Sequence, residues 1–208
     1  MTETDTHYYD PTIGHGLPHD PFKALVGPRP IGWISSCDEQ GRVNLAPYSF
    51  FNAFCAAPPI VGFASTGWKD SIRNIDKTGE FVVNLATRKL ANAMNLSSVP
   101  VPSDVDEFAV AGLKAAPCES VRPPRVEASP AALECRCVQI LPLVGLDGAV
   151  IDSWLVLGQV VGVHIRKEYL RDGLFDVSAA GVILRAGYVA DYAQIIPESV
   201  FRMPRPKI

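Results

Sequence analysis

Apolar residues along the chain alternate with polar ones or form short continuous runs, a pattern that predicts β-strands more often than helices. The runs are rich in Val, Ile, Leu and aromatic residues, which suit a pleated, partly buried surface. Helix-like spacing is confined to residues 69–77 and 87–95. We therefore expect a mainly β protein with inserted short helices, in a closed antiparallel barrel rather than a βαβ sheet. The expected strands span residues 30–37, 43–51, 60–64, 80–85, 132–141, 153–165 and 184–195.

Turn-forming residues between these runs predict how the strands connect. Asp38-Glu39-Gln40-Gly41 is typical of a hairpin loop, with the glycine free to take a positive φ. Residues 52–59 are expected to form a loop that ends at Pro58-Pro59, and Leu146-Asp147-Gly148 should turn the two longest strands back on each other. Pro47 lacks the N–H that a ladder needs, so its strand should carry a bulge or form a sheet edge where something other than a strand is paired.

The remaining segments are expected to lie outside the barrel, within one domain that spans residues 1–208. Residues 1–27, rich in proline and glycine towards their end, form an N-terminal arm. Residues 99–130 carry many prolines and acidic residues and should form an excursion from the barrel. Residues 197–208 form a Pro-rich, basic C-terminal tail.

Composition narrows the classes of partner. Hydrophobic residues make up 48% of the chain and charged residues 20%, enough apolar material for a core. A net charge of −3 provides no basic field for nucleic acid, and no apolar run is long enough to cross a bilayer. The first ten residues are polar and acidic, unlike a signal or transit peptide, so a cytoplasmic location is expected.

Cysteine and histidine spacing gives no reason to expect a metal site. Five cysteines without a repeating spacing do not describe a disulfide framework. Cys135-x-Cys137 places two thiols on one face of a strand, but buried thiols in a reducing compartment explain the pair better than a metal or redox site. The spacing of His7, His15 and His19 fits neither a zinc finger nor a metalloprotease helix.

The stretch from Ala64 to Leu85 predicts a strand, a polar turn, a short helix that ends at Gly79, and a second strand. A helix N-terminus offers unpaired N–H groups and partial positive charge, which suit a phosphate. Ser65, Thr66, Asp70 and Ser71 are candidates for capping the helix, and Lys69 adds a cation at the same turn. An ordinary capped surface helix is the competing interpretation, and spacing alone favours it because no Gly-rich phosphate motif is present.

In this order, several motifs resemble the flavin reductase-like, FMN-binding split-barrel family, which includes flavoredoxin and the reductase components of two-component flavin monooxygenases. The resemblance covers the chain from about Tyr8 to Tyr192. Its two departures are Ala186, where relatives often have a second glycine, and Ser71, where threonine is commoner. The runs that carry it are Pro28-Arg29-Pro30-Ile31-Gly32-Trp33-Ile34-Ser35, Asn44-Leu45-Ala46-Pro47-Tyr48-Ser49-Phe50-Phe51-Asn52, Lys69-Asp70-Ser71, Gly79-Glu80-Phe81-Val82-Val83-Asn84, Asp106-Glu107-Phe108 and Arg185-Ala186-Gly187-Tyr188.

The resemblance implies a homodimeric, Greek-key split barrel that binds one FMN per protomer at the subunit boundary. It makes the phosphate interpretation of the turn the better one. The residues implied for the phosphate and ribityl chain are Ser65, Thr66, Lys69, Asp70 and Ser71. Those implied for the flavin ring are Asn44, Ala46, Pro47, Tyr48 and Ser49, with Ser35, Ser36 and Asn52 in support. Three further residues each have a second interpretation: Trp33 contacts the ring or fills the core, Asn84 contacts flavin or forms a turn, and Arg185 lines the flavin edge or the dimer.

The function implied is that of an NAD(P)H-dependent flavin reductase, in which NADH or NADPH passes a hydride to flavin N5. The reduced flavin would then serve a partner monooxygenase or a small-molecule acceptor. One alternative is an FMN-dependent reductase of activated enones or quinones, with His164 or Tyr48 as hydrogen-bond donor to the substrate. Another is a non-catalytic FMN electron carrier. His164 is placed by the resemblance near the nicotinamide, whereas its position before Arg166 fits an exposed polar residue equally well.

Overall fold

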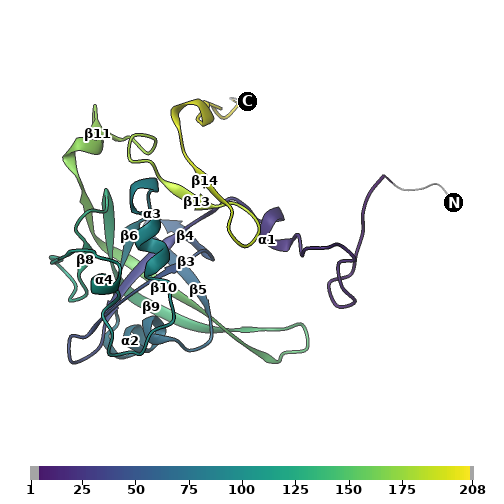
Figure 1. Cartoon of the computed structure of the whole chain (residues 1–208), viewed down its shortest axis with the longest axis horizontal. Helices are drawn as coiled ribbons and strands as arrows, with labels where there is room; N and C mark the ends of the chain where they lie inside the picture. The colour runs from purple at the N-terminus through teal and green to yellow at the C-terminus, as the bar shows by residue number, and fades with distance from the viewer. Residues whose placement is uncertain (1–4, 207–208) are drawn as a thin grey trace.

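Seven strands form one antiparallel sheet that curls into an open barrel (Figure 1). The computed structural model describes residues 5–206, so the first four residues of the expected arm and the last two of the expected tail lie outside it. The spatial order of the strands is β3-β2-β6-β9-β10-β5-β4. Their bounds are β2 (Gly32–Cys37), β3 (Val43–Tyr48), β4 (Phe51–Ala56), β5 (Pro59–Thr66), β6 (Glu80–Leu85), β9 (Ala131–Val144) and β10 (Val150–Ile165).

Curling brings the two edges of this sheet together. Strands β3 and β4 follow each other in the chain but lie at opposite ends of the strand order, so the sheet must bend round to join them. Tyr48 at the end of β3 packs on Phe63 of β5, with ring centroids 4.5 Å apart. The expected mainly β fold with short inserted helices is confirmed.

Helix α2 (Asp70–Thr78) links β5 to β6 and closes one end of the barrel. Ile72 and Ile75, three residues apart, lie on one face of the helix and are almost fully buried in the barrel core. Gly79 ends the helix at φ 71°, a left-handed conformation that glycine adopts without strain. The helix thus fixes the turn before it relative to the sheet.

The two larger apolar clusters lie on opposite faces of the sheet, so strand β2 is buried on both sides; a small third one holds Val82, Val121 and Ala132. The first fills the barrel and includes Ile34, Phe63 and Phe81. The second includes Trp33 and Leu45 and is covered by three short helices. These are η1 (Arg88–Leu90), α3 (Ala91–Leu96) and α4 (Glu107–Val110).

The excursion predicted for residues 99–130 folds over the outside of the sheet and contains α4 and a two-stranded ribbon. Asn84 of β6 ties it down: its Oδ1 accepts from the Val126 N–H at 2.7 Å, and its Nδ2 donates to the Trp33 carbonyl at 3.1 Å. The ribbon consists of β7 (Ala115–Ala116) and β8 (Arg125–Val126).

The arm and the C-terminal region extend from one end of the barrel (Figure 1). A small three-stranded sheet lies where they meet the body, in the order β1-β13-β14. The elements of this periphery are α1 (Phe22–Leu25), β1 (Arg29–Pro30), η2 (Lys167–Tyr169), β11 (Leu170–Arg171), β12 (Leu174–Phe175), β13 (Ile183–Arg185), β14 (Tyr192–Gln194) and η3 (Pro197–Ser199).

Three sequence-based expectations about elements are wrong. Residues 43–51 are not one strand, because β3 ends at Tyr48 and Phe51 begins β4. Residues 52–59 were expected to form a loop, but residues up to Ala56 belong to β4. This strand is exposed along most of its length, so its sequence lacks the alternation of apolar and polar residues that a buried face produces. Residues 184–195 are not one extended segment but the hairpin of β13 and β14, which turns where the Asp191 carbonyl accepts from the Ala186 N–H. None of the helices in residues 5–206 has the length and apolar character needed to cross a membrane.

Candidate functional site

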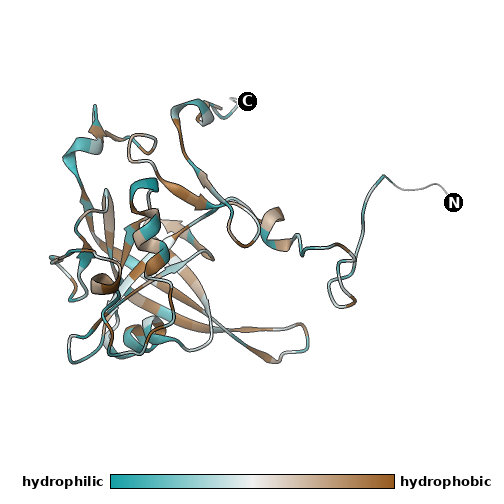
Figure 2. Cartoon of the chain, in the orientation of Figure 1, coloured by the Kyte–Doolittle hydropathy of each residue, from teal (hydrophilic) through white to brown (hydrophobic). Residues whose placement is uncertain are grey.

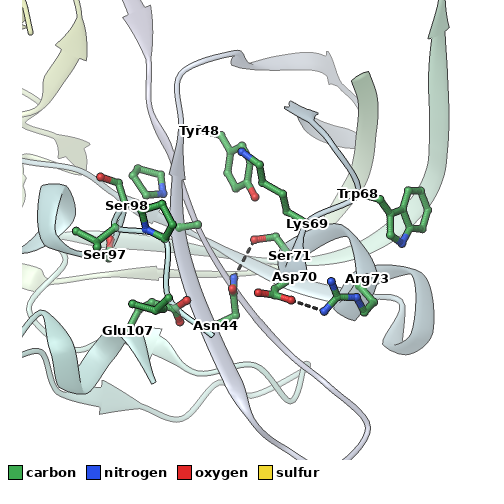
Figure 3. Close-up of a pocket in the computed structure, with 15 residues that line it drawn as sticks. Asn44, Tyr48, Trp68, Lys69, Asp70, Ser71, Arg73, Ser97, Ser98 and Glu107 are labelled. Carbon is green, nitrogen blue, oxygen red and sulfur yellow. Dashed lines mark hydrogen bonds and ion pairs between the residues drawn. The ribbon is translucent and has the colours of Figure 1, made fainter. Parts of the chain in front are cut away.

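A cavity of about 470 Å³ lies between strand β3, the start of α2 and the segment after α3 (Figure 3). Figure 3 shows Ser97 and Ser98 on one side of β3, and Lys69, Trp68 and Arg73 on the other. Its volume is in the range of small-molecule and cofactor sites, roughly 300–1,000 Å³. The lining residues are Asn44, Ala46, Pro47, Tyr48, Trp68, Lys69, Asp70, Ser71, Arg73, Ser97, Ser98, Val99, Pro100, Val101 and Glu107.

Strand β3 forms one wall of the cavity because it is an edge of the main sheet. Its Leu45 N–H points away from β2 and donates to Glu107 Oε2 at 3.1 Å. Backbone N–H groups alternate in direction along a strand, so the backbone nitrogen of Pro47 faces the same outer side as that of Leu45. Its missing N–H therefore costs no ladder bond with β2, and of the two expectations for this strand the edge is the one observed.

The N-terminus of α2 forms the second wall, and no side chain caps it. None of the expected capping residues fills that position; the N-cap is Lys69, whose side chain is exposed. Lys69 makes no ion pair within residues 5–206, whereas Asp70 pairs with Arg73 on the next turn. The first turn of a nine-residue helix thus presents uncapped N–H groups beside an available cation, an arrangement suited to an anion.

Hydrogen bonds fix the two walls to each other. Asn44 of β3 donates through Nδ2 to Ser71 Oγ at 2.8 Å (Figure 3). Both side chains are buried, so the bond is shielded from water. Asn74, one turn along α2, donates to Ser36 Oγ at 3.2 Å. The helix start is therefore held at a defined position against the edge strand.

Burial favours the neutral forms of two titratable side chains in the cavity, Tyr48 and Glu107. Burial raises the pKa of the Tyr48 phenol, against the opposing effect of the Ser71 and Ser65 hydroxyls. Burial also raises the pKa of Glu107, although the Leu45 N–H opposes this shift. Tyr48 is thus a neutral hydroxyl that can donate a hydrogen bond inside the cavity.

Several lining residues were not predicted from the sequence. Trp68 packs edge-on against Trp154, with centroids 4.6 Å apart, and is still 39% exposed at the cavity. Ser97 Oγ donates to the Met94 carbonyl at 2.8 Å and accepts from Trp33 Nε1 at 2.9 Å. The turn at 65–71 was a signal for Trp68 and Arg73, whereas nothing local marks residues 97–101, and Glu107 was recognised only as part of a family motif.

Seven of the predicted binding residues lie on the cavity, and the others do not. Ser65 and Thr66 end β5 behind the helix start, and Ser65 Oγ donates to the Gly67 carbonyl at 3.2 Å. Ser49 and Asn52 line a separate groove outside β4. Arg185 lies in a further pocket and donates to the Val189 carbonyl. The seven on the cavity are Asn44, Ala46, Pro47, Tyr48, Lys69, Asp70 and Ser71.

Four predicted residues use their polar atoms inside the fold. Ser35 donates to the Pro124 carbonyl at 2.6 Å and accepts from Asn84 at 3.1 Å. Trp33 is fully buried in the second apolar cluster, as its core-packing interpretation expected. Ser36 and Asn84 are likewise fully buried. These residues shape the wall behind the cavity rather than its surface.

His164 also lies away from this cavity. Its Nε2 is 2.5 Å from Glu134 Oε1, on the outer face of β9 and β10 under the excursion. Burial alone would raise the pKa of Glu134, but the Glu119 N–H, His164 and the Ser120 N–H together lower it. Within the single chain the structure therefore separates the two predicted catalytic residues, Tyr48 and His164.

These features fit a flavin that carries a phosphate. The uncapped helix start with Lys69 suits the phosphate. On the outer side of β3 the Leu45 N–H is bound to Glu107 and Pro47 has no N–H, so the backbone carbonyls of this edge strand are what can meet the polar edge of a ring. Trp68 adds an aromatic surface to the same cavity. The polar and aromatic groups thus meet in one place, as a mostly planar ligand with an anionic tail requires.

Comparison with known proteins agrees with this geometry. Residues 27–179 match the model of the flavin reductase like domain. An uncharacterized protein of Deinococcus radiodurans is 36% identical over 194 residues, which cover 88% of this chain and 82% of that protein.

Two solved structures are also similar. Nitrilotriacetate monooxygenase component B from Bacillus cereus superposes with a TM-score of 0.80 and 27% identity, over 88% of this chain and 90% of that one. The 2-nitrobenzoate 2-nitroreductase NbaA of Pseudomonas fluorescens gives a TM-score of 0.76 and 27% identity, over 89% and 88%. With the match over residues 27–179, these relationships show that the chain belongs to the flavin reductase like family.

Proposed function

We propose that this protein is an NAD(P)H-dependent flavin reductase that binds FMN in the cavity beside β3. The observation that carries the proposal is the uncapped start of α2, with Lys69 in no ion pair among the described residues. A phosphate placed there would receive backbone N–H groups, the helix dipole and a lysine at once. Ser71 lies in the same turn and lines the cavity.

The edge strand and Tyr48 would orient the ring. Residues 44–48 belong to an edge strand, so their outward backbone carbonyls and the Tyr48 hydroxyl can meet the polar edge of the ring in the cavity. Asn44 fixes this strand to the helix start, so the phosphate and ring sites keep a constant separation. Such preorganisation favours one orientation of a bound ligand.

Bound FMN would supply the redox chemistry, exchanging two electrons with the nicotinamide of NADH or NADPH. The chain needs no nucleophile or acid–base pair for this reaction; its residues bind, orient and shield. Trp68 and residues 97–101 line the cavity, where they would shield a bound ring from water. Tyr48 stays neutral and supplies a hydrogen bond without adding a negative charge.

A homodimer belongs to the same proposal. The β9–β10 hairpin projects from the barrel, and Figure 2 shows apolar colour along these strands. Leu143, Leu146 and Ile151 are exposed there in the single chain. Covering such an apolar surface with a second copy would be favourable.

The acceptor of the reduced flavin has two candidates. Similarity to a monooxygenase component B supports transfer to a partner oxygenase. Similarity to a nitroreductase supports direct reduction of a small molecule held beside Tyr48. Both candidates share the same flavin site.

Anaerobic single-turnover mixing of the FMN-loaded protein with NADH and with NADPH tests the proposal. At least one nucleotide should bleach the flavin absorbance faster than it bleaches free FMN under the same conditions. Bound FMN that neither nucleotide reduces faster would identify an electron carrier instead of a reductase. Failure of the purified chain to bind FMN would overturn the assignment of the cavity itself.

A further inference from the structure

A second group of reactive side chains lies outside the flavin cavity. Cys118, Glu134 and His164 come from three segments: the excursion, β9 and β10. One ligand atom from each lies within 4.8 Å of the other two. Glu134 is fully buried and His164 has a quarter of its side chain exposed. The cluster is closed on the protein side and open towards solvent at His164.

A β-bulge brings His164 to this face of the sheet. Val160 of β10 pairs with Cys135, but the next residue of β9, Glu134, pairs with Gly162, so β10 gains one residue between them. Side chains alternate along a regular strand, and without the extra residue His164 would point into the barrel core, as Val160 does. With it, the imidazole lies beside Glu134 on the outer face.

The carboxylate of Glu134 is held in a fixed orientation. Its two oxygens accept from the backbone N–H groups of Glu119, at 2.9 Å, and Ser120, at 2.6 Å. Both donors directly follow Cys118, so the loop that carries the thiol is fastened to the carboxylate. Opposite Glu134, a Cβ on Gly162 would lie 3.1 Å from the carboxyl carbon, so glycine leaves the carboxylate its space. Such supporting contacts are typical of the surroundings of metal ligands.

We propose that Cys118, Glu134 and His164 bind one zinc ion, through a thiolate, a carboxylate oxygen and Nε2, with solvent as the fourth ligand. Sulfur, nitrogen and oxygen are the ligands of zinc in proteins, and a thiolate with an imidazole disfavours Mg²⁺ and Ca²⁺. Tetrahedral zinc, with bonds of about 2.0–2.3 Å, keeps its ligands roughly 3.4–3.6 Å apart. The ion would therefore replace the direct contact between His164 and Glu134, and the partly exposed imidazole has room to move outwards.

The ion would clamp the excursion to the outer face of the barrel. Cys118 packs against the apolar residues Val82, Val121 and Ala132. An ion pair between Glu134 and His164 accounts for those two side chains, but it does not require a sulfur within 4.8 Å of both, which a shared metal ion does. None of the three residues lines the flavin cavity, so the two sites are separate. The zinc proposal therefore stands or falls independently of the flavin proposal.

Cobalt(II) titration of the purified full-length protein tests the site, because cobalt binds zinc sites and reports a thiolate ligand by a charge-transfer absorption. The wild-type protein should bind one Co²⁺ with this absorption, and one equivalent of Zn²⁺ should abolish it. Cys118→Ser should remove the band and weaken Co²⁺ binding at least about 100-fold. Loss of a residue that only supports a ligand costs roughly 10–100-fold, so loss of a ligand should cost more. Cys55→Ser, at an exposed cysteine on β4, is the matched control and should change neither.

Circular dichroism of each variant separates loss of the site from loss of the fold. Should Cys118→Ser fail to fold, His164→Gln changes a partly exposed ligand and should also weaken Co²⁺ binding at least about 100-fold by the same reasoning. The proposal is overturned if the wild-type protein shows no thiolate band, if the band survives in Cys118→Ser, or if Cys55→Ser removes it.

Discussion

Asn44 in the edge strand β3 donates a hydrogen bond of 2.8 Å to Ser71 in the first turn of α2. The two residues are 27 positions apart in the chain, and both are buried. One belongs to the wall proposed for the flavin ring, and the other to the turn proposed for the phosphate. Their bond therefore couples the two halves of the site.

Asn44→Ala should weaken FMN binding and also lower stability. The change removes a buried bond whose net contribution is about 1 kcal/mol and leaves the Ser71 hydroxyl short of one partner. Affinity should fall about fivefold, in line with a loss of roughly 1 kcal/mol. Flavin fluorescence titration and urea unfolding measure the two effects. Asn52→Ala, at an exposed amide on β4, should leave both unchanged, and equal losses in the two variants would contradict the coupling.

Lys69→Ala should weaken FMN binding by about tenfold or more, because a charge-assisted contact to the phosphate is lost. Riboflavin has the same ring but no phosphate, so its affinity should not change. Isothermal titration with both ligands gives the comparison. Stability should stay close to wild type because the Lys69 side chain is exposed.

Lys77→Ala is the matched control for that experiment. Lys77 lies in the last turn of the same helix, close to Asp76 and outside the flavin cavity. Its loss changes the net charge by the same amount but removes nothing from the phosphate site. Equal weakening of FMN in both lysine variants would show that only overall charge matters, and would remove α2 from the site.

Local sequence signals were sufficient where a buried face or a turn residue marked the element. Ile72, Ile75 and Gly79 located α2, and the turn around Gly148 correctly paired β9 with β10. Strand β4 gave no such signal because its side chains are mostly exposed. The mainly β fold could therefore be predicted, but not the full length of its exposed edge.

The candidate site was harder to predict because its walls depend on long-range contacts. Glu107 reaches the cavity only because α4 folds back on β3, 62 residues away along the chain. The alternation of β10 gave no warning of the extra residue before Gly162 that turns His164 outwards. For Trp33 the sequence left a ring contact and core packing both open, and only the tertiary structure decides for the core.

Gly158→Ala should destabilise the barrel by about 1–3 kcal/mol, the usual cost of overpacking a core. A Cβ at this position would lie 2.4 Å from the ring of Phe81, which is fully buried and packs edge-on against Phe63. Chemical denaturation measures the loss. Gly187→Ala is the control, since its nearest neighbour would be an ordinary 3.5 Å contact; equal effects in both variants would show that the cost does not arise from the barrel core.

Glu107→Gln should alter how stability depends on pH. Burial raises the pKa of Glu107 above its usual 4.5, so the folded protein binds this proton more tightly than the unfolded chain does. The resulting stabilisation is fully present below the unfolded pKa and is lost as pH rises through the folded pKa. The stability of the wild type relative to Glu107→Gln should therefore fall as pH increases from below 4.5 towards neutrality.

The glutamine amide oxygen can still accept from the Leu45 N–H, so the substitution removes the titration and keeps the acceptor. Urea unfolding of both proteins over this pH range measures the difference in free energy of unfolding. The exposed Glu127→Gln serves as the control for loss of one negative charge. A difference between wild type and Glu107→Gln that stays constant with pH, or grows as pH rises, would contradict a raised pKa and with it the burial of this carboxyl group in the cavity wall.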